Sequence, residues 1–317
     1  MTKGIDMMIT ATGLTKRYGD TVAVDDLTFE VKPGIVTGFL GPNGAGKTTT
    51  MRLILGLDKA TAGTVTVNGQ TYRGKRAPMQ EIGALIDPSA VHGGRSAYNH
   101  LLWQAQAGGL PRSRVDDVLE MVGLTEVAEK KVGGFSLGMH QRLGIGSALL
   151  GDPPMLLLDE PVNGLDPEGI QWVRTLTRRF ASEGRTVFIS SHLMSEMELT
   201  ADHVLVIGKG HLVADMAMNA FMQRSAHSHV KIISIRAHDL IPYLEAKGAV
   251  VTNGTINELA VTGLDASVIG AIAFEHGIPL NELSTQRASL ETAFMELTHD
   301  SVEFRADRGP IHEVAVA

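Results

Sequence analysis

The segment GPNGAGKT at residues 41–48 constrains the fold of this chain more than any other. It matches the pattern G-x-x-x-x-G-K-[ST] and lies between an apolar run, Ile35–Leu40, and a stretch of helical spacing that begins at Lys47. Glycines in such a loop let backbone N–H groups turn inward, and the following helix directs its positive dipole end to the same point. The sequence therefore predicts a strand–loop–helix unit that binds phosphate groups.

Each part of this loop has an expected role. Lys47 would bridge the β- and γ-phosphate oxygens of a nucleoside triphosphate, and the Thr48 hydroxyl would hold Mg²⁺. The alternative is a glycine-rich turn with an incidental lysine, but the strand before the loop and the helix after it disfavour that interpretation. The expected phosphate-binding residues are Gly41, Pro42, Asn43, Gly44, Ala45, Gly46, Lys47, Thr48 and Thr49.

A second apolar run, MLLL at residues 155–158, ends in Asp159 and Glu160. A carboxylate after a buried strand can reach the Mg²⁺ shell beside Thr48, and its neighbour can polarise an attacking water. We therefore expect Asp159 on the metal side and Glu160 as the general base. Taken alone, two acids at the end of a strand are more often a helix cap or a solvated turn.

The periodicity of apolar residues predicts an α/β fold followed by a second, smaller domain. Apolar runs separated by turn residues such as Pro33-Gly34 predict strands of a parallel sheet, and residues 92–150 form a helical insertion. After the polar stretch QRSAHS at 223–228, the order β-α-β-β-α-β plus a helix predicts a ferredoxin-like α+β domain. The expected domains are residues 1–222 and 229–298, with a loose tail at 299–317.

Composition excludes several kinds of chemistry and partner. Without cysteine the chain can form no disulfide, thiolate zinc site, iron–sulfur cluster or cysteine nucleophile. A formal charge of −7 gives no overall attraction to nucleic acid or to an anionic lipid surface. The N-terminus lacks the apolar core of a signal peptide, and every apolar run is shorter than the ~20 residues of a membrane helix. Any action at a membrane is therefore expected to need a partner.

Further motifs along the chain resemble those of ABC-type ATPases. FSLGMHQR at 135–142 resembles the signature motif, LLLDEPVNGLDP at 156–167 resembles the Walker B and D-loop motifs, and FISSHL at 188–193 supplies the switch histidine. With the phosphate loop they occur in the order of that family, and the resemblance covers residues 8 to about 215. LTKRYGDTVAVDDLTFEV at 14–31 and SLETAFMELT at 289–298 resemble ATPase subunits of bacterial antibiotic-resistance exporters of the daunorubicin and bacitracin kind.

The resemblance implies roles for individual residues. Tyr18 would stack its ring on adenine, and His192 would contact the γ-phosphate. Ser136 and Gly138 begin a helix that would face the γ-phosphate bound by a second subunit, so that two ATP molecules lie in a head-to-tail dimer. Asp166 would couple the two sites, and it could also cap the helix that follows it.

The sequence departs from this family in two places. Most ABC ATPases have a glutamine that ligates Mg²⁺ where this chain has Asp87, which is either a metal ligand or a turn residue before Pro88. The signature motif has Leu137 and Met139 in place of the common glycine and glutamine, a change that leaves the expected roles of the neighbouring serine and glycine intact.

In the family, the surface after this position receives a coupling helix of the transmembrane subunit. Apolar residues could form that groove here, although each aromatic or leucine among them could instead belong to the core. The candidates are Val91, Leu101, Leu102 and Trp103.

The resemblance thus implies an ATPase that uses ATP and Mg²⁺ and powers export of a hydrophobic, antibiotic-like substrate through a separate transmembrane permease. The chain would act as a dimer with a second ATPase subunit, at the cytoplasmic face of the membrane, without nucleic acid. One alternative is a soluble ABC ATPase acting on nucleic acid or ribosomes, and another is ATP binding without turnover, which Glu160 and His192 disfavour. The C-terminal domain would be regulatory or stabilise the dimer.

Overall fold

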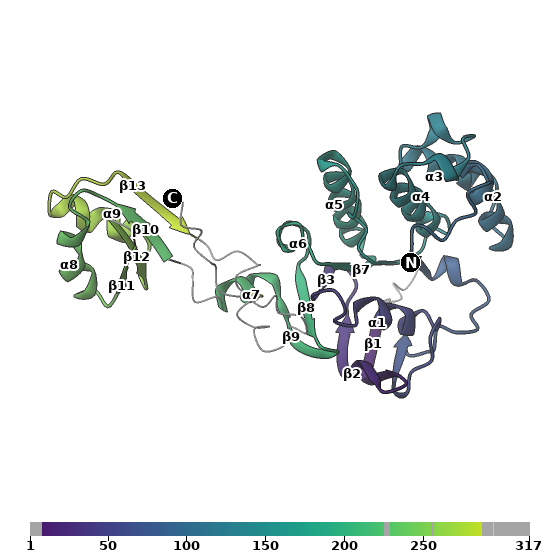
Figure 1. Ribbon diagram of the computed structural model, residues 1–317, viewed down its shortest axis with the longest axis horizontal. Helices are drawn as coiled ribbons and strands as arrows, with labels where there is room; N and C mark the ends of the chain where they lie inside the picture. The colour runs from purple at the N-terminus through teal and green to yellow at the C-terminus, as the bar shows by residue number, and fades with distance from the viewer. Residues whose placement is uncertain (1–7, 225–228, 255–256, 287–293, 295–317) are drawn as a thin grey trace, which may run out of the picture. The chain divides into compact units, whose positions relative to one another are not determined.

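The computed structural model describes residues 8–224, 229–254, 257–286 and Phe294. The chain divides between Ala217 and Met218 into two compact units, and each is treated by itself (Figure 1). Among the described residues, no helix has both the length and the hydrophobicity needed to cross a membrane.

A six-stranded sheet forms the centre of the first unit. Its order is β5 (Ile82–Leu85), β6 (Met155–Leu158), β7 (Thr186–Ser191), β3 (Val36–Leu40), β8 (His203–Gly208) and β9 (His211–Ala217). The first five strands are parallel, as predicted, and β9 is an antiparallel edge strand that the periodicity did not reveal. Every residue of β3, β6 and β7 is buried, which explains the continuous apolar run of β6. The buried residues of β3 and β7 also include threonine and serine side chains.

Two helices of this unit follow the strands that carry the predicted site. α1 (Lys47–Ile54) follows β3, and α5 (Pro167–Ser182) comes after β6 and contacts β7 and β3. A third, α6 (Met194–Thr200), packs so closely on β3 that a Cβ on Gly38 would lie 2.6 Å from the Met197 sulfur. The close packing of α6 on β3 therefore requires a glycine at position 38.

An antiparallel sheet covers part of the same core. Its order is β2 (Thr21–Val31), β1 (Ile9–Tyr18) and β4 (Ala62–Val67). Phe29 of this sheet contacts Phe39 and Phe188 of the parallel sheet, with ring centroids 6.2 and 6.1 Å apart. These contacts bury aromatic surface from both sheets and pack β2 against β3 and β7.

Residues between β5 and β6 form the predicted helical insertion. It contains α2 (Ala97–Ala107), α3 (Ser113–Met121) and α4 (Leu137–Leu149), grouped apart from β1 and β2 in Figure 1. Short 3-10 turns of the insertion lie at Thr125–Val127 and Val132–Gly134, and another, Pro78–Gln80, precedes β5. α4 packs against β5, where Gly144 leaves no room for a side chain beside Leu85.

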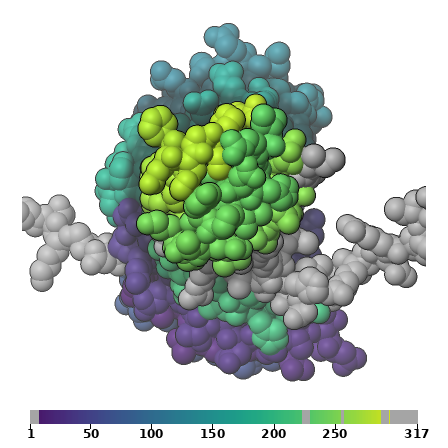
Figure 2. Space-filling view, turned by 90° about the vertical axis from the view of Figure 1, so that its left-hand side faces the viewer, coloured from purple at the N-terminus to yellow at the C-terminus, as the bar shows by residue number. Residues whose placement is uncertain are grey.

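The second unit is a small α+β domain whose outer surface is green to yellow in Figure 2. Its four strands are antiparallel in the order β11-β12-β10-β13, the ferredoxin-like arrangement. The predicted helix at 290–298 and the tail at 299–317 lie outside the described residues, apart from Phe294. The elements of this unit are α7 (Met218–Arg224), β10 (His229–Ile233), the 3-10 turn Ala237–Leu240, α8 (Ile241–Glu245), β11 (Val250–Asn253), β12 (Glu258–Thr262), α9 (Ala266–Glu275) and β13 (Glu282–Gln286).

Candidate functional site

The loop at 41–48 joins β3 to α1, as the sequence predicted. Gly46 adopts φ 106°, and a Cβ there would lie 2.4 Å from the Ala23 carbonyl oxygen, so the loop requires glycine at this position. The loop residues 42–49, together with Ala23 and Glu160, line a pocket of about 200 Å³. The pocket therefore brings together the phosphate loop and one member of the predicted acidic pair.

The Lys47 ammonium lies at this pocket. The side chain is 6% exposed, and its Nζ donates hydrogen bonds to the carbonyl oxygens of Gly41 at 2.7 Å and Pro42 at 3.3 Å. The same nitrogen is 3.4 Å from Glu160 Oε1. A cation held by two carbonyl oxygens of this loop is suited to binding an anionic phosphate chain.

Asp159 lies beside the loop, because β6 and β3 end at the same edge of the sheet. The Thr48 hydroxyl donates to one of its carboxylate oxygens, and the Ser190 hydroxyl donates to the other. Asp159 is only 5% exposed. Two of the three residues considered as metal ligands, Thr48 and Asp159, are thus in direct contact.

The backbone of Glu160 is unusual and firmly held. It adopts φ 47°, a left-handed conformation that non-glycine residues rarely occupy outside functional sites and turns. The Ser190 hydroxyl accepts its N–H at 2.9 Å, and Gln141 Nε2 donates to its carbonyl oxygen at 3.0 Å. His192 Nδ1 lies 2.7 Å from Oε2 of the same carboxylate, so the predicted base and the switch histidine meet.

Sequence reasoning did not identify Ser190 and Gln141 as site residues. Both stand in quoted motifs, and both are buried polar residues: Ser190 is completely buried near the end of β7, and Gln141 is 1% exposed within α4. A buried polar side chain must find a hydrogen-bond partner, and that requirement is the signal that could have found them.

Tyr18 ends β1 and does not line the phosphate pocket. Its hydroxyl donates to Asp58 Oδ2 at 2.8 Å, and Arg52 of α1 pairs with the same carboxylate. Burial, followed by the hydrogen bond and charge of Asp58, raises the pKa of Tyr18. The Arg52 guanidinium, and next the Tyr18 hydroxyl, lower the pKa of Asp58 by hydrogen bonding.

Ser136 and Asp166 cap neighbouring helices. Ser136 Oγ accepts the Met139 N–H at 3.2 Å at the start of α4, and Asp166 accepts a backbone N–H at 2.9 Å in the first turn of α5. The capping role considered for Asp166 is therefore present in the structure. A Cβ on Gly138 would lie 3.1 Å from the Gly164 carbonyl oxygen, so the two helix starts are close together. Neither start lines the phosphate pocket of this chain.

Asp87 forms a local turn. Its Oδ1 accepts from the backbone N–H of Ser89 at 2.8 Å and from the Ser89 hydroxyl at 2.6 Å. The residue lines a different pocket, of about 650 Å³, rather than the phosphate pocket. Metal contact by Asp87 stays a prediction, and the turn role considered beside it is the one seen here.

That larger pocket is a groove between β5, α2 and α4, which we call the α2 groove. Val91 and Trp103 line it, and Trp103 is 51% exposed. Of the other two candidates, Leu101 is completely buried, which is the core role considered as its alternative. Leu102 is not among the residues that line the groove, because neighbouring positions on a helix face different directions. Buried His100 also lines the groove, and burial, with the charge of Arg95, lowers its pKa.

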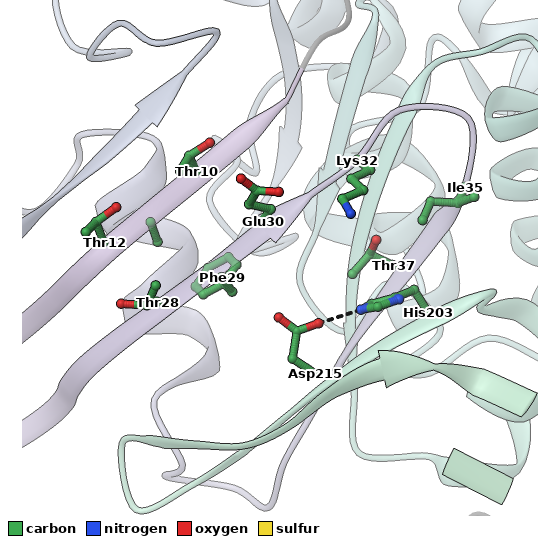
Figure 3. A pocket seen from close by; sticks show the side chains of 11 residues that line it. Thr10, Thr12, Thr28, Phe29, Glu30, Lys32, Ile35, Thr37, His203 and Asp215 are labelled. Carbon is green, nitrogen blue, oxygen red and sulfur yellow. Dashed lines mark hydrogen bonds and ion pairs between the residues drawn. The ribbon is translucent and has the colours of Figure 1, made fainter. Parts of the chain in front are cut away.

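A further pocket, of about 400 Å³, lies between β1, β2, β3, β8 and β9 (Figure 3). Its clearest polar feature is His203 Nε2, 2.6 Å from Asp215 Oδ1. None of the residues expected to bind nucleotide or metal lines it. The candidate site is therefore the phosphate pocket.

Known proteins resemble this chain over most of its length. The sequence family described as "ABC transporter" matches residues 24–163, and a domain of unknown function matches 228–291. The bacitracin transport ATP-binding protein BcrA of Bacillus licheniformis is 37% identical over 92% of this chain and 97% of its own length. The linearmycin resistance ATP-binding protein LnrL of Bacillus subtilis is 32% identical over 92% of this chain and 98% of its own length.

Solved structures show the same cassette. An ATP-binding subunit of an ABC transporter is 25% identical with a TM-score of 0.63, covering 68% of this chain and 92% of that one. The cassette MJ0796 matches with a TM-score of 0.62 at 22% identity, covering 66% of this chain and 98% of that one, and supports the fold.

Proposed function

Because this chain belongs to the ATP-binding proteins of ABC transporters, we propose that it is the ATPase subunit of an exporter, acting through the residues of the phosphate pocket. The observation that carries the proposal is the meeting of Lys47 and Glu160 in one pocket, although more than a hundred residues separate them in the chain. Phosphoryl transfer to water needs an ammonium that binds the phosphates and a carboxylate that activates the attacking water, and these two side chains supply both groups.

The groups beside the pocket fit Mg²⁺. Thr48 and Asp159 present a hydroxyl and a carboxylate in direct contact, and Mg²⁺ prefers such oxygen ligands. The described residues contain no group of three or more His, Asp or Glu side chains that could form a complete cage. Mg²⁺ in such sites takes only one or two protein ligands, along with phosphate oxygens and water. When bound, it would neutralise charge on the β- and γ-phosphates.

The chemistry proposed for this pocket is hydrolysis of the γ-phosphate. Water attacks the γ-phosphorus, the bond to the β–γ bridging oxygen breaks, and ADP and phosphate leave. Glu160 takes the proton of the water at Oε1, which is buried and has no hydrogen-bond partner among the described residues. His192 holds the other carboxylate oxygen and so orients the base, while Lys47 stabilises charge on the phosphates.

The helix starts at Ser136 and Asp166 support a dimer of ATPase subunits. Ser136 is exposed, and its helix of 13 residues presents an N-terminus that does not face the phosphate pocket of its own chain. Such an N-terminus favours an anion. We therefore assign Ser136 and Gly138 to the γ-phosphate bound by a second subunit, with Asp166 beside them.

The α2 groove supports docking of a permease. A half-exposed Trp103 and a lining that is mostly apolar suit a helix or loop of a partner. The bacitracin and linearmycin relatives are named for antibiotic transport or resistance, so an antibiotic-like molecule is the proposed cargo of the permease. The second unit is proposed to regulate or stabilise the dimer.

Glu160→Gln tests the catalytic assignment. The amide keeps the shape of the side chain but cannot accept the proton, so ATP hydrolysis should fall by about 100-fold or more while ATP binding persists. The matched control is Glu129→Gln, which changes an exposed acid outside the pocket and should leave the rate unchanged. Turnover in Glu160→Gln equal to that of the natural chain would show that another group is the base.

A further inference from the structure

Three side chains form a hydrogen-bonded cluster at the end of β1, which we call the tyrosine cluster: Tyr18, Arg52 and Asp58. The Tyr18 hydroxyl donates to Asp58 Oδ2 at 2.8 Å. Arg52 donates to the same oxygen from Nε at 2.8 Å and to Oδ1 from Nη2 at 3.2 Å. Asp58 is therefore fixed by a bidentate contact with Arg52, and it accepts the hydrogen bond of the Tyr18 hydroxyl.

One face of the Tyr18 ring is covered by a cation. Lys16 Nζ lies 4.7 Å from the ring centroid, and it is fixed there by donating to the Lys59 carbonyl oxygen at 2.8 Å. Tyr18 is nevertheless 48% exposed, which leaves ring surface for a second flat group. A ring with one occupied face and a fixed hydroxyl can receive an aromatic partner in one orientation only.

The cluster also links the tyrosine to the phosphate loop. Arg52, which holds Asp58, lies on α1, the helix that begins at Lys47. The adenine and the phosphates of a nucleotide are parts of one molecule. A ring that stacks on the adenine must therefore lie at a fixed distance from the loop that binds the phosphates. The tyrosine cluster supplies such a connection.

We propose that Asp58 is a positioning residue, which fixes the Tyr18 ring so that it stacks on the adenine base of the bound nucleotide. This inference rests on the proposed ATP site. Asp58 acts through the tyrosine and has no part in phosphate binding, so its contribution should depend on the base alone.

The size of the effect follows from rotamer populations. A tyrosine whose hydroxyl is unbound samples about three staggered χ1 wells, of which one matches the base. Apparent affinity falls in proportion to the fraction of competent protein, so loss of the hydrogen bond should weaken nucleotide binding about threefold.

Calorimetric titration of the full chain with Mg·ADP and with Mg·pyrophosphate tests this prediction, because neither probe is hydrolysed at the γ-phosphate and only ADP carries a base. Asp58→Ala and Tyr18→Phe should each weaken ADP binding about threefold and leave pyrophosphate binding unchanged. The double variant should lose no more than either single variant, since both remove one hydrogen bond. Tyr18→Phe leaves Arg52 and Asp58 paired, so it remains informative if Asp58→Ala folds poorly.

Asp117→Asn is the matched control. It breaks an exposed Arg114–Asp117 pair of 3.4 Å on α3 and should change neither affinity. Unchanged ADP binding in both cluster variants, or equal losses for ADP and pyrophosphate, would overturn the role of Asp58 while leaving the proposed function standing. Failure of the natural chain to bind either probe would instead overturn the proposed function, and the inference with it.

A spectroscopic measurement gives an independent result. The chain has four tyrosines, so carbon-13 labelling of the phenol carbon and comparison with Tyr18→Phe identify the Tyr18 signal. Burial and Asp58 raise its pKa, whereas Arg52 and Thr49 oppose them. In Asp58→Ala the Tyr18 signal should titrate at lower pH than in the natural chain, and ADP should shift it in the natural chain. A pKa unaffected by the substitution would contradict the contact.

Discussion

Glu160 shows how much a single residue of this site depends on its neighbours. Its left-handed backbone, with φ 47°, is held by hydrogen bonds to Ser190 and Gln141. One oxygen of its carboxylate contacts His192, and the other lies near the Lys47 ammonium. A strained backbone conformation of this kind persists only where surrounding contacts hold it in place. The position of the proposed base therefore results from hydrogen bonds to segments that precede and follow it in the chain.

Gly46→Ala is predicted to destabilise the first unit. The new Cβ would lie 2.4 Å from the Ala23 carbonyl oxygen at a φ of 106°, so conformational strain and overlap combine. We expect a loss of about 3 kcal/mol in unfolding free energy, measured by denaturant titration. Gly74→Ala is the matched control: its φ is 84° but nothing lies within 4 Å, so about 1 kcal/mol is expected. Equal losses in the two variants would contradict the contribution of the Ala23 contact.

At the scale of elements, the strands most readily predicted from the sequence were those whose residues are buried on both faces. β3, β6 and β7 are buried on both faces, so each contains consecutive apolar residues that can be recognised without knowing the neighbouring strands. β9 was not predicted because it is an edge strand in which exposed and buried residues do not alternate regularly. A charged residue, Asp215, also interrupts its apolar residues. Its pairing with β8, rather than its own pattern, makes it a strand.

The N-terminus of α4 yields a prediction that separates capping from anion binding. Ser136→Asp keeps a good cap, so stability should change by less than about 1 kcal/mol, but it places a negative charge where the γ-phosphate of a second subunit is proposed to lie. ATPase activity should fall at least tenfold while the melting temperature stays close to that of the natural chain. Ser136→Thr keeps both the cap and the hydroxyl and serves as the control. Full activity in Ser136→Asp would exclude an anion at this helix.

At the scale of the whole molecule, the two units have separate hydrophobic cores. The first is built around residues such as Phe39 and Phe188, and the second around residues such as Ile232 and Leu259. All residues of the proposed nucleotide site belong to the first unit. Ligand binding stabilises only the part of a protein that folds around the ligand.

Calorimetry of the full chain should therefore show two thermal transitions. Mg·ADP at about 100 times its dissociation constant should stabilise the first unit by about 2.7 kcal/mol and leave the transition of the second unaffected. Lys47→Ala, which removes the ammonium proposed to bind phosphate, should abolish most of that shift. A single transition that moves as a whole would show that the two units unfold together.

The sequence by itself determined the order of the motifs, the phosphate loop and the α/β character of the first unit, because each depends on residues adjacent in the chain. Tertiary structure decided which distant side chains meet. Lys47 with Glu160, Asp159 with Ser190, and the tyrosine cluster all join segments whose separation is set by strand order. Local periodicity fixes which face of an element is buried, whereas contacts between elements depend on how the sheet is assembled, which no single segment specifies.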